Sequence, residues 1–366
     1  MNIIPEYLNG YHSAGDYSCE IPCVVRENKD NPDAEFYLAM NDGDVLAAVK
    51  GNSQVPIRIL GAQEPQHYYP LLKLEYLSKH FEGSALLDRK SDLPWPIIPN
   101  MHVVKEVNMP KDALPKATFV ARNCYPMNNR NEYVRVIGNK IGLIAPGECL
   151  NNMNWPDCNG RPCSKVEVLR GYKIHLAFEN GDSPGFVTDK PYHAFEAGVL
   201  PVWMGTRDIA DAVPKGSYID VAEFNSPDDV ANYLKLVLEN ETLYNSYFEW
   251  KKKPFDPEYV KNNEVLWTES IFCRICYYVD TLKRGLEWDH ARQRAKSSDV
   301  IDRNISINFS VKELAIEPSC RNGLCKIFGA THIMLFILLA NSILILVVLL
   351  RKLPIRIPFT RQIWDR

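Results

Sequence analysis

The stretch that decides the fold is Tyr172–Gly205, YKIHLAFENGDSPGFVTDKPYHAFEAGVLPVWMG. Its apolar run Ile174–Phe178 predicts a strand, and a polar, glycine-containing loop follows at residues 179–185. A short helix is expected to open at Thr188, and Val199–Met204 predicts a second strand. A strand, a helix and a second strand in this order form a βαβ unit, which predicts a parallel sheet.

The end of the first strand is the expected binding end of this unit. Open parallel sheets bind ligands outside the carboxyl ends of their strands, where a helix N-terminus offers free N–H groups to phosphate. Lys190 lies in that first helical turn. The simpler alternative is that Lys190 is a solvated lysine and the loop only a connection, which is the commoner case for an isolated strand, loop and helix.

Short motifs in this stretch resemble the donor signature of the α1,3-fucosyltransferases. They are Phe-Glu-Asn at 178–180, Phe-Val-Thr-Asp-Lys at 186–190 and Glu-Ala-Gly at 196–198 with Pro201-Val202. Further blocks resemble the family at 119–124 with Asn129-Arg130, and at Cys273-Arg-Ile-Cys276. The resemblance runs from Gly61 to Val279 and is closest to plant-type enzymes that act on the N-glycan core. It implies an α/β fold of the GT-B class, with two Rossmann-like domains facing a cleft.

The resemblance also implies roles for individual residues. It places Arg130 and Lys190 on the pyrophosphate of GDP-fucose, where an arginine fork and a lysine charge would neutralise the leaving group without a tightly held metal. Glu64, before Pro65, would be the general base, because partial desolvation raises the pKa of a carboxyl group and suits it to take a proton. The remaining residues of the donor pocket would be Glu179, Asn180, Phe186 and Asp189.

Two positions depart from the family pattern. The family usually has Tyr where this chain has Phe186, and Glu where it has Asp189. A missing hydroxyl removes one hydrogen bond, worth about 1 kcal/mol, and the shorter aspartate reaches less far. We expect GDP-fucose as the donor substrate, no obligatory cofactor and no metal site, with stimulation by a divalent metal left open. The triplet Asp42-Gly43-Asp44 resembles the acidic motif with which GT-A enzymes bind manganese, but it is equally consistent with an acidic turn.

The chain divides into five predicted segments. Residues 1–115 are the N-terminal acceptor-side α/β domain, and residues 116–282 the GDP-fucose-binding domain. The charged residues 283–326 are expected to be a stem. Residues 327–350 contain no Asp, Glu, Lys or Arg and predict a transmembrane helix, and the basic residues 351–366 predict a cytosolic tail.

Cysteines and glycosylation motifs indicate the secretory pathway. Ten cysteines suit either disulfides in an oxidising compartment or zinc, and the irregular spacing favours disulfides. The resemblance implies that Cys273 and Cys276 pin the end of the donor domain. Three sequons begin at Asn240, Asn304 and Asn308. With the predicted tail anchor, these features predict a single-pass Golgi membrane protein with a luminal catalytic domain, although its start lacks a typical leader. A cytosolic tail-anchored protein is the second reading.

The overall charge excludes one class of partner. The formal net charge of −3 over 366 residues gives no basic face for a nucleic acid. We therefore expect inverting transfer of L-fucose from GDP-fucose to a GlcNAc hydroxyl of a glycan or glycoprotein, in α1,3 linkage and on the N-glycan core. The alternatives are a membrane-anchored glycan-binding protein with this fold and no transfer, or a GT-B transferase that uses another nucleotide sugar.

Overall fold

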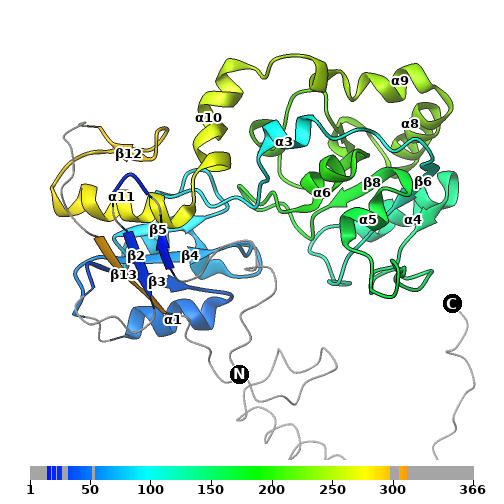
Figure 1. Ribbon diagram of the computed structural model, residues 1–366. Helices are drawn as coiled ribbons and strands as arrows, with labels where there is room; N and C mark the ends of the chain where they lie inside the picture. The colour runs from blue at the N-terminus through cyan, green and yellow to red at the C-terminus, as the bar shows by residue number, and fades with distance from the viewer. Residues whose placement is uncertain are drawn as a thin grey trace, which may run out of the picture. The chain divides into compact units, whose positions relative to one another are not determined.

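The computed structural model describes residues 15–17, 19–21, 23–26, 32–51, 54–296 and 305–310. These residues form two mostly parallel sheets with helices on both faces (Figure 1). This is the α/β arrangement expected for a GT-B glycosyltransferase.

The first sheet has six strands. Only the pair β1 and β2 is antiparallel, and the other neighbours run parallel. In spatial order the strands are β1 (Gly15–Tyr17), β2 (Cys23–Arg26), β13 (Ile305–Ser310), β3 (Ala34–Leu38), β4 (Arg58–Ala62) and β5 (Gly83–Leu86).

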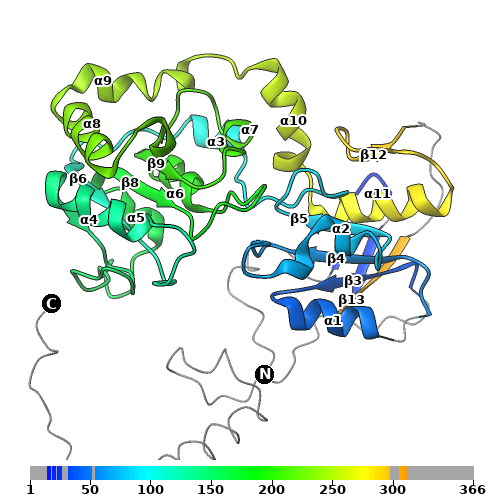
Figure 2. The same ribbon diagram turned by 180° about the vertical axis from the view of Figure 1, so that it is seen from behind.

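Side chains alternate between two cores on this sheet, as the pleat of a strand requires. Phe36 and Ile59 face one core together with α11 (Ile271–Lys283), whereas Tyr37 and Leu60 face the other. Figures 1 and 2 show α11 and α1 on opposite faces of the sheet. The helices of the second face are α1 (Asp42–Lys50), the 3-10 turn η2 (Pro70–Leu72) and α2 (Leu74–Leu77). Asp42 and Asp44 lie in the first turn of α1, so the acidic triplet is a helix start.

The second sheet has five strands, and every pair is parallel. In spatial order they are β10 (Ile219–Asp220), β9 (Leu200–Met204), β8 (Tyr172–Phe178), β6 (Leu114–Thr118) and β7 (Leu143–Ile144). Its helices and turns are α3 (Met101–Lys105), α4 (Arg130–Ile141), α5 (Lys165–Leu169), α6 (Lys190–Ala197), α7 (Ile209–Ala212), η3 (Val221–Glu223), α8 (Pro227–Glu239), α9 (Glu241–Ser246), η4 (Glu249–Lys252) and α10 (Pro257–Thr268).

The predicted βαβ unit is confirmed. β8 and β9 are parallel neighbours, with His175 opposite Pro201, and α6 connects them. The helix begins at Lys190, two residues later than expected, and ends at Gly198, whose φ of 72° is a left-handed conformation that glycine adopts easily. The open end of this unit therefore lies where the sequence placed it.

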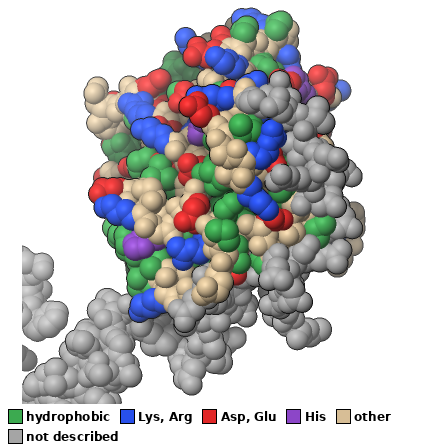
Figure 3. Space-filling view, turned by 90° about the vertical axis from the view of Figure 1, so that its left-hand side faces the viewer, with side chains coloured by type: hydrophobic (Ala, Val, Ile, Leu, Met, Phe, Trp, Pro, Cys, Tyr) green, Lys and Arg blue, Asp and Glu red, His purple; other side chains and the backbone are tan. Residues whose placement is uncertain are grey.

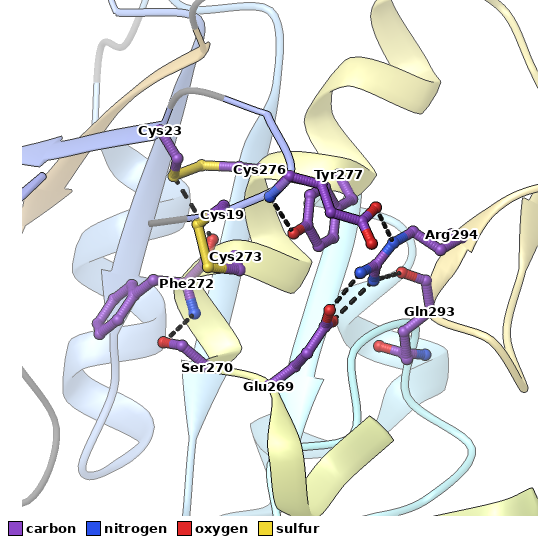
Figure 4. The surroundings of a disulfide bond; sticks show 11 residues. Cys19, Cys23, Glu269, Ser270, Phe272, Cys273, Cys276, Tyr277, Gln293 and Arg294 are labelled. Atoms are coloured by element: carbon purple, nitrogen blue, oxygen red, sulfur yellow. Dashed lines mark hydrogen bonds and ion pairs between the residues drawn. A yellow bond between two sulfur atoms is a disulfide. The ribbon is translucent and has the colours of Figure 1, made fainter. Parts of the chain in front are cut away.

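Disulfide bonds fasten α11 to the N-terminal strands. Cys19 bonds Cys273, and Cys23 bonds Cys276, across more than 250 residues of sequence. Figure 4 shows both bonds, with Tyr277 accepting a hydrogen bond from the Glu20 amide at 2.9 Å. Cys273 and Cys276 thus do form disulfide bonds, but these bonds fasten α11 to the first sheet rather than to the second.

Two further disulfides lie beside the second sheet. Cys124 bonds Cys149, and Cys158 bonds Cys163. No cysteine among the described residues is free. Cys320 and Cys325 lie outside the described residues.

The segment predicted as a stem differs from that expectation. Residues 288–295 form the small hairpin of β11 (Trp288–Asp289) and β12 (Arg294–Ala295), and β13 inserts between β2 and β3. Ile305 and Ile307 are buried in the first core. A strand this short, next to charged residues, gives little periodic signal, so its partners decide its fold.

The predicted fold class is corrected in one respect. It included a C-terminal transmembrane helix, yet within the described ranges no helix is long and apolar enough to cross a membrane. The predicted helix at 327–350 and tail at 351–366 lie outside the described residues. The part of the predicted fold class that the described residues support is the pair of sheets with their flanking helices.

Candidate functional site

The loop at the end of β8, residues 179–189, is called the donor loop below. Glu179 opens it and is completely buried. Its Oε1 accepts hydrogen bonds from the Thr188 amide at 2.9 Å and the Thr188 hydroxyl at 2.7 Å, and its Oε2 lies 2.5 Å from Lys190 Nζ. One carboxylate therefore joins the start of the loop to its end.

Lys190 is the cation at the first turn of α6. Its side chain is 18% exposed, and its ammonium also donates to Thr188 Oγ1 at 2.7 Å. No side chain among the described residues makes a capping hydrogen bond at the N-terminus of α6. The partly exposed ammonium of Lys190 therefore lies at the first turn of α6, paired with the Glu179 carboxylate.

Arg130 is not placed as the sequence predicted. The residue is 1% exposed, and its guanidinium donates to Phe178 O at 2.9 Å and Asn123 O at 2.5 Å. The group lies over the Phe119 ring, 5.5 Å from its centroid. Burial lowers the pKa of Arg130, and the nearby Glu179 carboxylate opposes this change. In this structure Arg130 therefore supports the end of β8 and does not line an open surface with Lys190.

Asp189 is part of a charged cluster that the sequence analysis did not foresee. Its Oδ2 lies 3.3 Å from Lys165 Nζ and 3.1 Å from His193 Nδ1. Burial raises the pKa of the Asp189 carboxyl, but the His193 ring and the charges of Lys165 and Lys190 together hold it well below its usual range. Asp189 is therefore an anion held between two neighbouring elements. Lys165 was missed because its position 24 residues away in sequence carries no local signal.

The two remaining donor-pocket residues face the first sheet's side of the loop. Phe186 is 6% exposed and meets the His67 ring edge-on, with centroids 5.9 Å apart. Asn180 has a buried Oδ1 with no hydrogen-bond partner among the described residues, while its backbone carbonyl accepts from Met127 N at 2.8 Å. An unpaired buried acceptor is unfavourable, so Asn180 is suited to a ligand hydroxyl.

Glu64 follows the carboxyl end of β4 and lies in a small pocket with the donor loop. The pocket combines residues from the Glu64 segment and from the loops after β5 and β8. Its lining is Glu64, Pro65, Gln66, Leu72, Leu86, Leu87, Asp88, Pro184 and Phe186. The structure thus brings the predicted base and the predicted donor residue Phe186, 122 positions apart in the sequence, to one place.

His175 in β8 is a histidine to which the sequence analysis gave no role. His175 is 1% exposed, its Nδ1 lies 3.1 Å from Thr118 Oγ1, and its Nε2 has no partner among the described residues. Burial, followed by the charge of Lys165, lowers the pKa of His175 well below its usual range. His175 is therefore a neutral core residue.

Other predicted sites have simpler outcomes. Among the described residues, no group of three or more His, Cys, Asp or Glu side chains could hold a metal ion. Asn240 is exposed and caps α9, accepting from Leu243 N at 3.0 Å. Asn304 lies outside the described residues, and Asn308 lies within β13. On the face drawn in Figure 3, basic and acidic side chains are mixed.

Two residues outside the donor loop, His67 and Asp208, contact it and were given no role from the sequence. His67 and Ser183 form a contact between the Glu64 segment and the loop. Asp208, after β9, accepts a hydrogen bond from Gly185 N at 2.5 Å. These contacts join residues far apart in the chain, so no local motif predicts them.

Comparison with known proteins identifies fucosyltransferases as similar to this chain. Residues 110–291 match the family described as glycosyltransferase family 10 (fucosyltransferase), C-terminal part. The chain is similar to GDP-fucose protein O-fucosyltransferase 3 of Rattus norvegicus, with 31% identity over 208 residues, 52% of this chain and 43% of that protein. It is also similar to glycoprotein 3-alpha-L-fucosyltransferase A of Drosophila melanogaster, with 33% identity over 175 residues, 47% of this chain and 32% of that protein.

The chain spans less than half the length of these relatives. A crystal structure of an alpha1,3-fucosyltransferase is more distant, with a TM-score of 0.47 and 16% identity over 67% of this chain and 80% of that chain. The likeness to a plant-type subfamily is not among these findings.

Proposed function

Residues 110–291 of this chain match glycosyltransferase family 10, and from that match we propose that the chain transfers L-fucose from GDP-fucose to an acceptor hydroxyl. One observation carries the proposal beyond the family. Glu64 and the donor loop line the same pocket, although they come from different sheets. A base close to the donor loop is what transfer to a hydroxyl requires.

The proposed reaction inverts the anomeric carbon in a single displacement. The acceptor oxygen forms a bond to C1 of fucose while the bond from C1 to the diphosphate oxygen breaks, and that electron pair leaves with GDP. The acceptor proton passes to the Glu64 carboxylate. Lys190 and the uncapped N-terminus of α6 stabilise the charge that develops on the diphosphate.

The donor loop supplies the shape of the donor site in this proposal. Glu179 and Thr188 hold Lys190 at the loop's end, and the unpaired Asn180 Oδ1 can accept a hydrogen bond from a ribose or fucose hydroxyl. Arg130 acts indirectly, since its guanidinium holds the carbonyl of Phe178 at the point where the loop begins. No step of this proposed reaction uses a metal ion. Whether a divalent metal stimulates the activity would be measured separately.

For the acceptor, we propose a GlcNAc hydroxyl of a glycan, with an α1,3 linkage and the N-glycan core as the preferred substrate. The similarity to glycoprotein 3-alpha-L-fucosyltransferase A supports this assignment. A second candidate is a serine or threonine hydroxyl of a protein, which the similarity to GDP-fucose protein O-fucosyltransferase 3 supports. Both acceptors require the same donor site and the same base.

The test is mass spectrometry of products from the full chain incubated with GDP-fucose. The acceptors are an N-glycan with an exposed core, N-acetyllactosamine and folded secreted domains rich in Ser and Thr. NMR of the product's anomeric proton reports linkage and inversion, and thermal shifts with GDP-mannose and UDP-sugars test other donors. Fucose on a glycan supports the first acceptor and fucose on a protein the second. Glycan binding without any transfer would refute the proposed activity.

A matched pair of variants tests the base. Glu64→Gln keeps the shape of the side chain but cannot take a proton, so kcat should fall by about 10²- to 10⁴-fold while GDP binding is kept. Glu75→Gln makes the same chemical change at a glutamate that is 87% exposed on α2, and its kcat should stay that of the wild type. Equal rates for Glu64→Gln and wild type would remove Glu64 from the mechanism.

We also propose that the chain works in an oxidising compartment, with the Golgi lumen as the expected site. Four disulfide bonds support this, because such bonds persist where thiols are not kept reduced. The exposed Asn240 is the sequon that can be tested most directly. Chain secreted from animal cells should lose mass on treatment with an N-glycosidase, and Asn240→Gln should remove that difference if it is the site used.

A further inference from the structure

Three residues of the donor loop surround one imidazole, that of His67. The backbone amide of His67 donates to Ser183 Oγ at 3.0 Å, and its Nδ1 is hydrogen-bonded to the same hydroxyl. The Phe186 ring meets the imidazole edge-on, at an interplanar angle of 85°. Contacts with Gly181 complete the enclosure, so the ring is inserted into the loop.

Gly181 shows how tightly the imidazole fits. A Cβ atom added at position 181 would lie 2.0 Å from His67 Nε2 and 2.1 Å from its Cε1. Contacts this short do not occur, so no side chain can stand at position 181 while His67 keeps its place. Glycine is required at position 181 because a side chain would meet the imidazole. Backbone conformation is not the reason, since Gly181 is not in the left-handed region.

The contacts also hold the ring in place and bear on its charge. Ser183 Oγ accepts from the His67 amide and is hydrogen-bonded to Nδ1 of the same residue. Nε2 has no hydrogen-bond partner among the described residues. Burial lowers the pKa of His67, and the negative charges of Asp182 and Glu179 oppose that change. An imidazole held at Nδ1 and at its backbone amide is a rigid spacer.

His67 lies three residues after Glu64, and the backbone between them is folded back on itself. The amides of Tyr68 and Tyr69 both donate to the Pro65 carbonyl, at 3.1 and 3.2 Å. The Tyr68 hydroxyl also accepts from Asn123 Nδ2 at 2.9 Å, which ties the segment to the second sheet a second time. A displacement of His67 is therefore passed on to Glu64.

We propose that His67 is a positioning residue that sets the separation between Glu64 and the donor loop, by inserting its imidazole against Gly181, Ser183 and Phe186. The inference rests on the proposed function, because it concerns the alignment of a base with a donor. Donor affinity depends mainly on Lys190 and Glu179, which His67 does not hold in place. Loss of the spacer should therefore lower kcat more than it weakens GDP binding.

The test is a double-mutant cycle in the full chain, using Gly181→Ala and His67→Ala. Gly181→Ala alone should lower kcat by about tenfold or more, because a misplacement of roughly 1 Å can reduce a rate by about 10²-fold. In the His67→Ala background the added methyl has room, so Gly181→Ala should change kcat by less than about threefold. GDP affinity, measured by calorimetry, should stay within about threefold in all four proteins.

Two controls separate positioning from general stability. Gly171→Ala adds a Cβ whose nearest neighbour is Val168 O at 3.6 Å, an ordinary contact, and should match wild type. His67→Asn places an amide oxygen near the position of Nδ1, so it can still bond Ser183 and should retain more activity than His67→Ala.

The outcomes are distinct. If Gly181→Ala lowers kcat equally with and without the imidazole, or if GDP affinity falls in parallel with kcat, His67 does not position the base. If the wild type transfers no fucose to any acceptor, the proposed function fails instead. In that case, unfolding in urea tests whether the loop encloses the His67 ring. Gly181→Ala should lower the free energy of unfolding when His67 is present and leave it unchanged in the His67→Ala background.

Discussion

Removing the Thr188 hydroxyl gives the most direct test of how the donor loop is held. Thr188 is 7% exposed, and its hydroxyl lies 2.7 Å from both Glu179 Oε1 and Lys190 Nζ. The hydroxyl donates its proton to the carboxylate and accepts from the ammonium. Thr188→Val replaces this hydroxyl by a methyl group of similar size, so it deletes both hydrogen bonds without opening a cavity.

The expected loss can be worked out from these contacts. A hydrogen bond to a charged group contributes about 1.5 to 3 kcal/mol. Glu179 keeps its bonds from the Thr188 amide and from Lys190, so its charge stays paired. We therefore expect Thr188→Val to lower the free energy of unfolding by about 3 kcal/mol, at the lower end for two such bonds because water can reach the partly exposed Lys190.

Thr188→Ser is the matched control. It keeps the hydroxyl and removes only a buried methyl group, which should lower the free energy of unfolding by about 1 kcal/mol. Equilibrium unfolding in urea under oxidising conditions measures both variants, and an unchanged slope against urea shows that they unfold in the same way. Calorimetry with GDP should show weaker binding for the valine variant than for the serine variant. If valine is as stable as wild type, or serine is less stable than valine, the hydroxyl does not hold the loop.

Three further predictions follow from buried groups away from the loop's end. The pKa of His175 is lowered from its ordinary value of 6.5, so its contribution to stability is complete above about pH 6.5 and is lost as pH falls, by up to about 1.4 kcal/mol per pH unit. In urea titrations between pH 7 and 5, His175→Gln should therefore make the free energy of unfolding depend less on pH. An unchanged pH dependence would contradict this. Arg130→Met leaves the carbonyls of Phe178 and Asn123 without their guanidinium donors and should lower the free energy of unfolding by about 3 kcal/mol, whereas no loss would mean that the two bonds are dispensable. Replacing Cys124 and Cys149 together by serine opens a bridge between residues 25 positions apart and should lower the free energy of unfolding by roughly 3 kcal/mol, with denaturant melts in the presence and absence of reductant as the check.

Local patterns in the sequence predicted the donor half of the molecule well. The apolar run before Glu179 became β8. Glycine at 198 ends α6 in a left-handed conformation. Strand periodicity, capping and glycine conformation depend on neighbours within a few residues, so they can be predicted without knowledge of the fold.

The candidate site was predicted in part. Lys190 lies in the first turn of α6 beside Glu179, and Glu64 shares a pocket with Phe186. Arg130 differs, because a residue type and a motif position do not reveal whether a guanidinium faces solvent or two backbone carbonyls. That choice depends on how α4 packs against the end of β8.

By itself the sequence determined the βαβ unit, the helix caps and the use of cysteines for bridges, because each depends on residue types and short spacings. Only the tertiary structure decided that Cys19 pairs with Cys273, that residues 305–310 insert into the first sheet, and that His67 enters the donor loop. The physical reason is that these contacts join segments more than 100 residues apart. Their free energy comes from burying surfaces against partners that no local pattern can name.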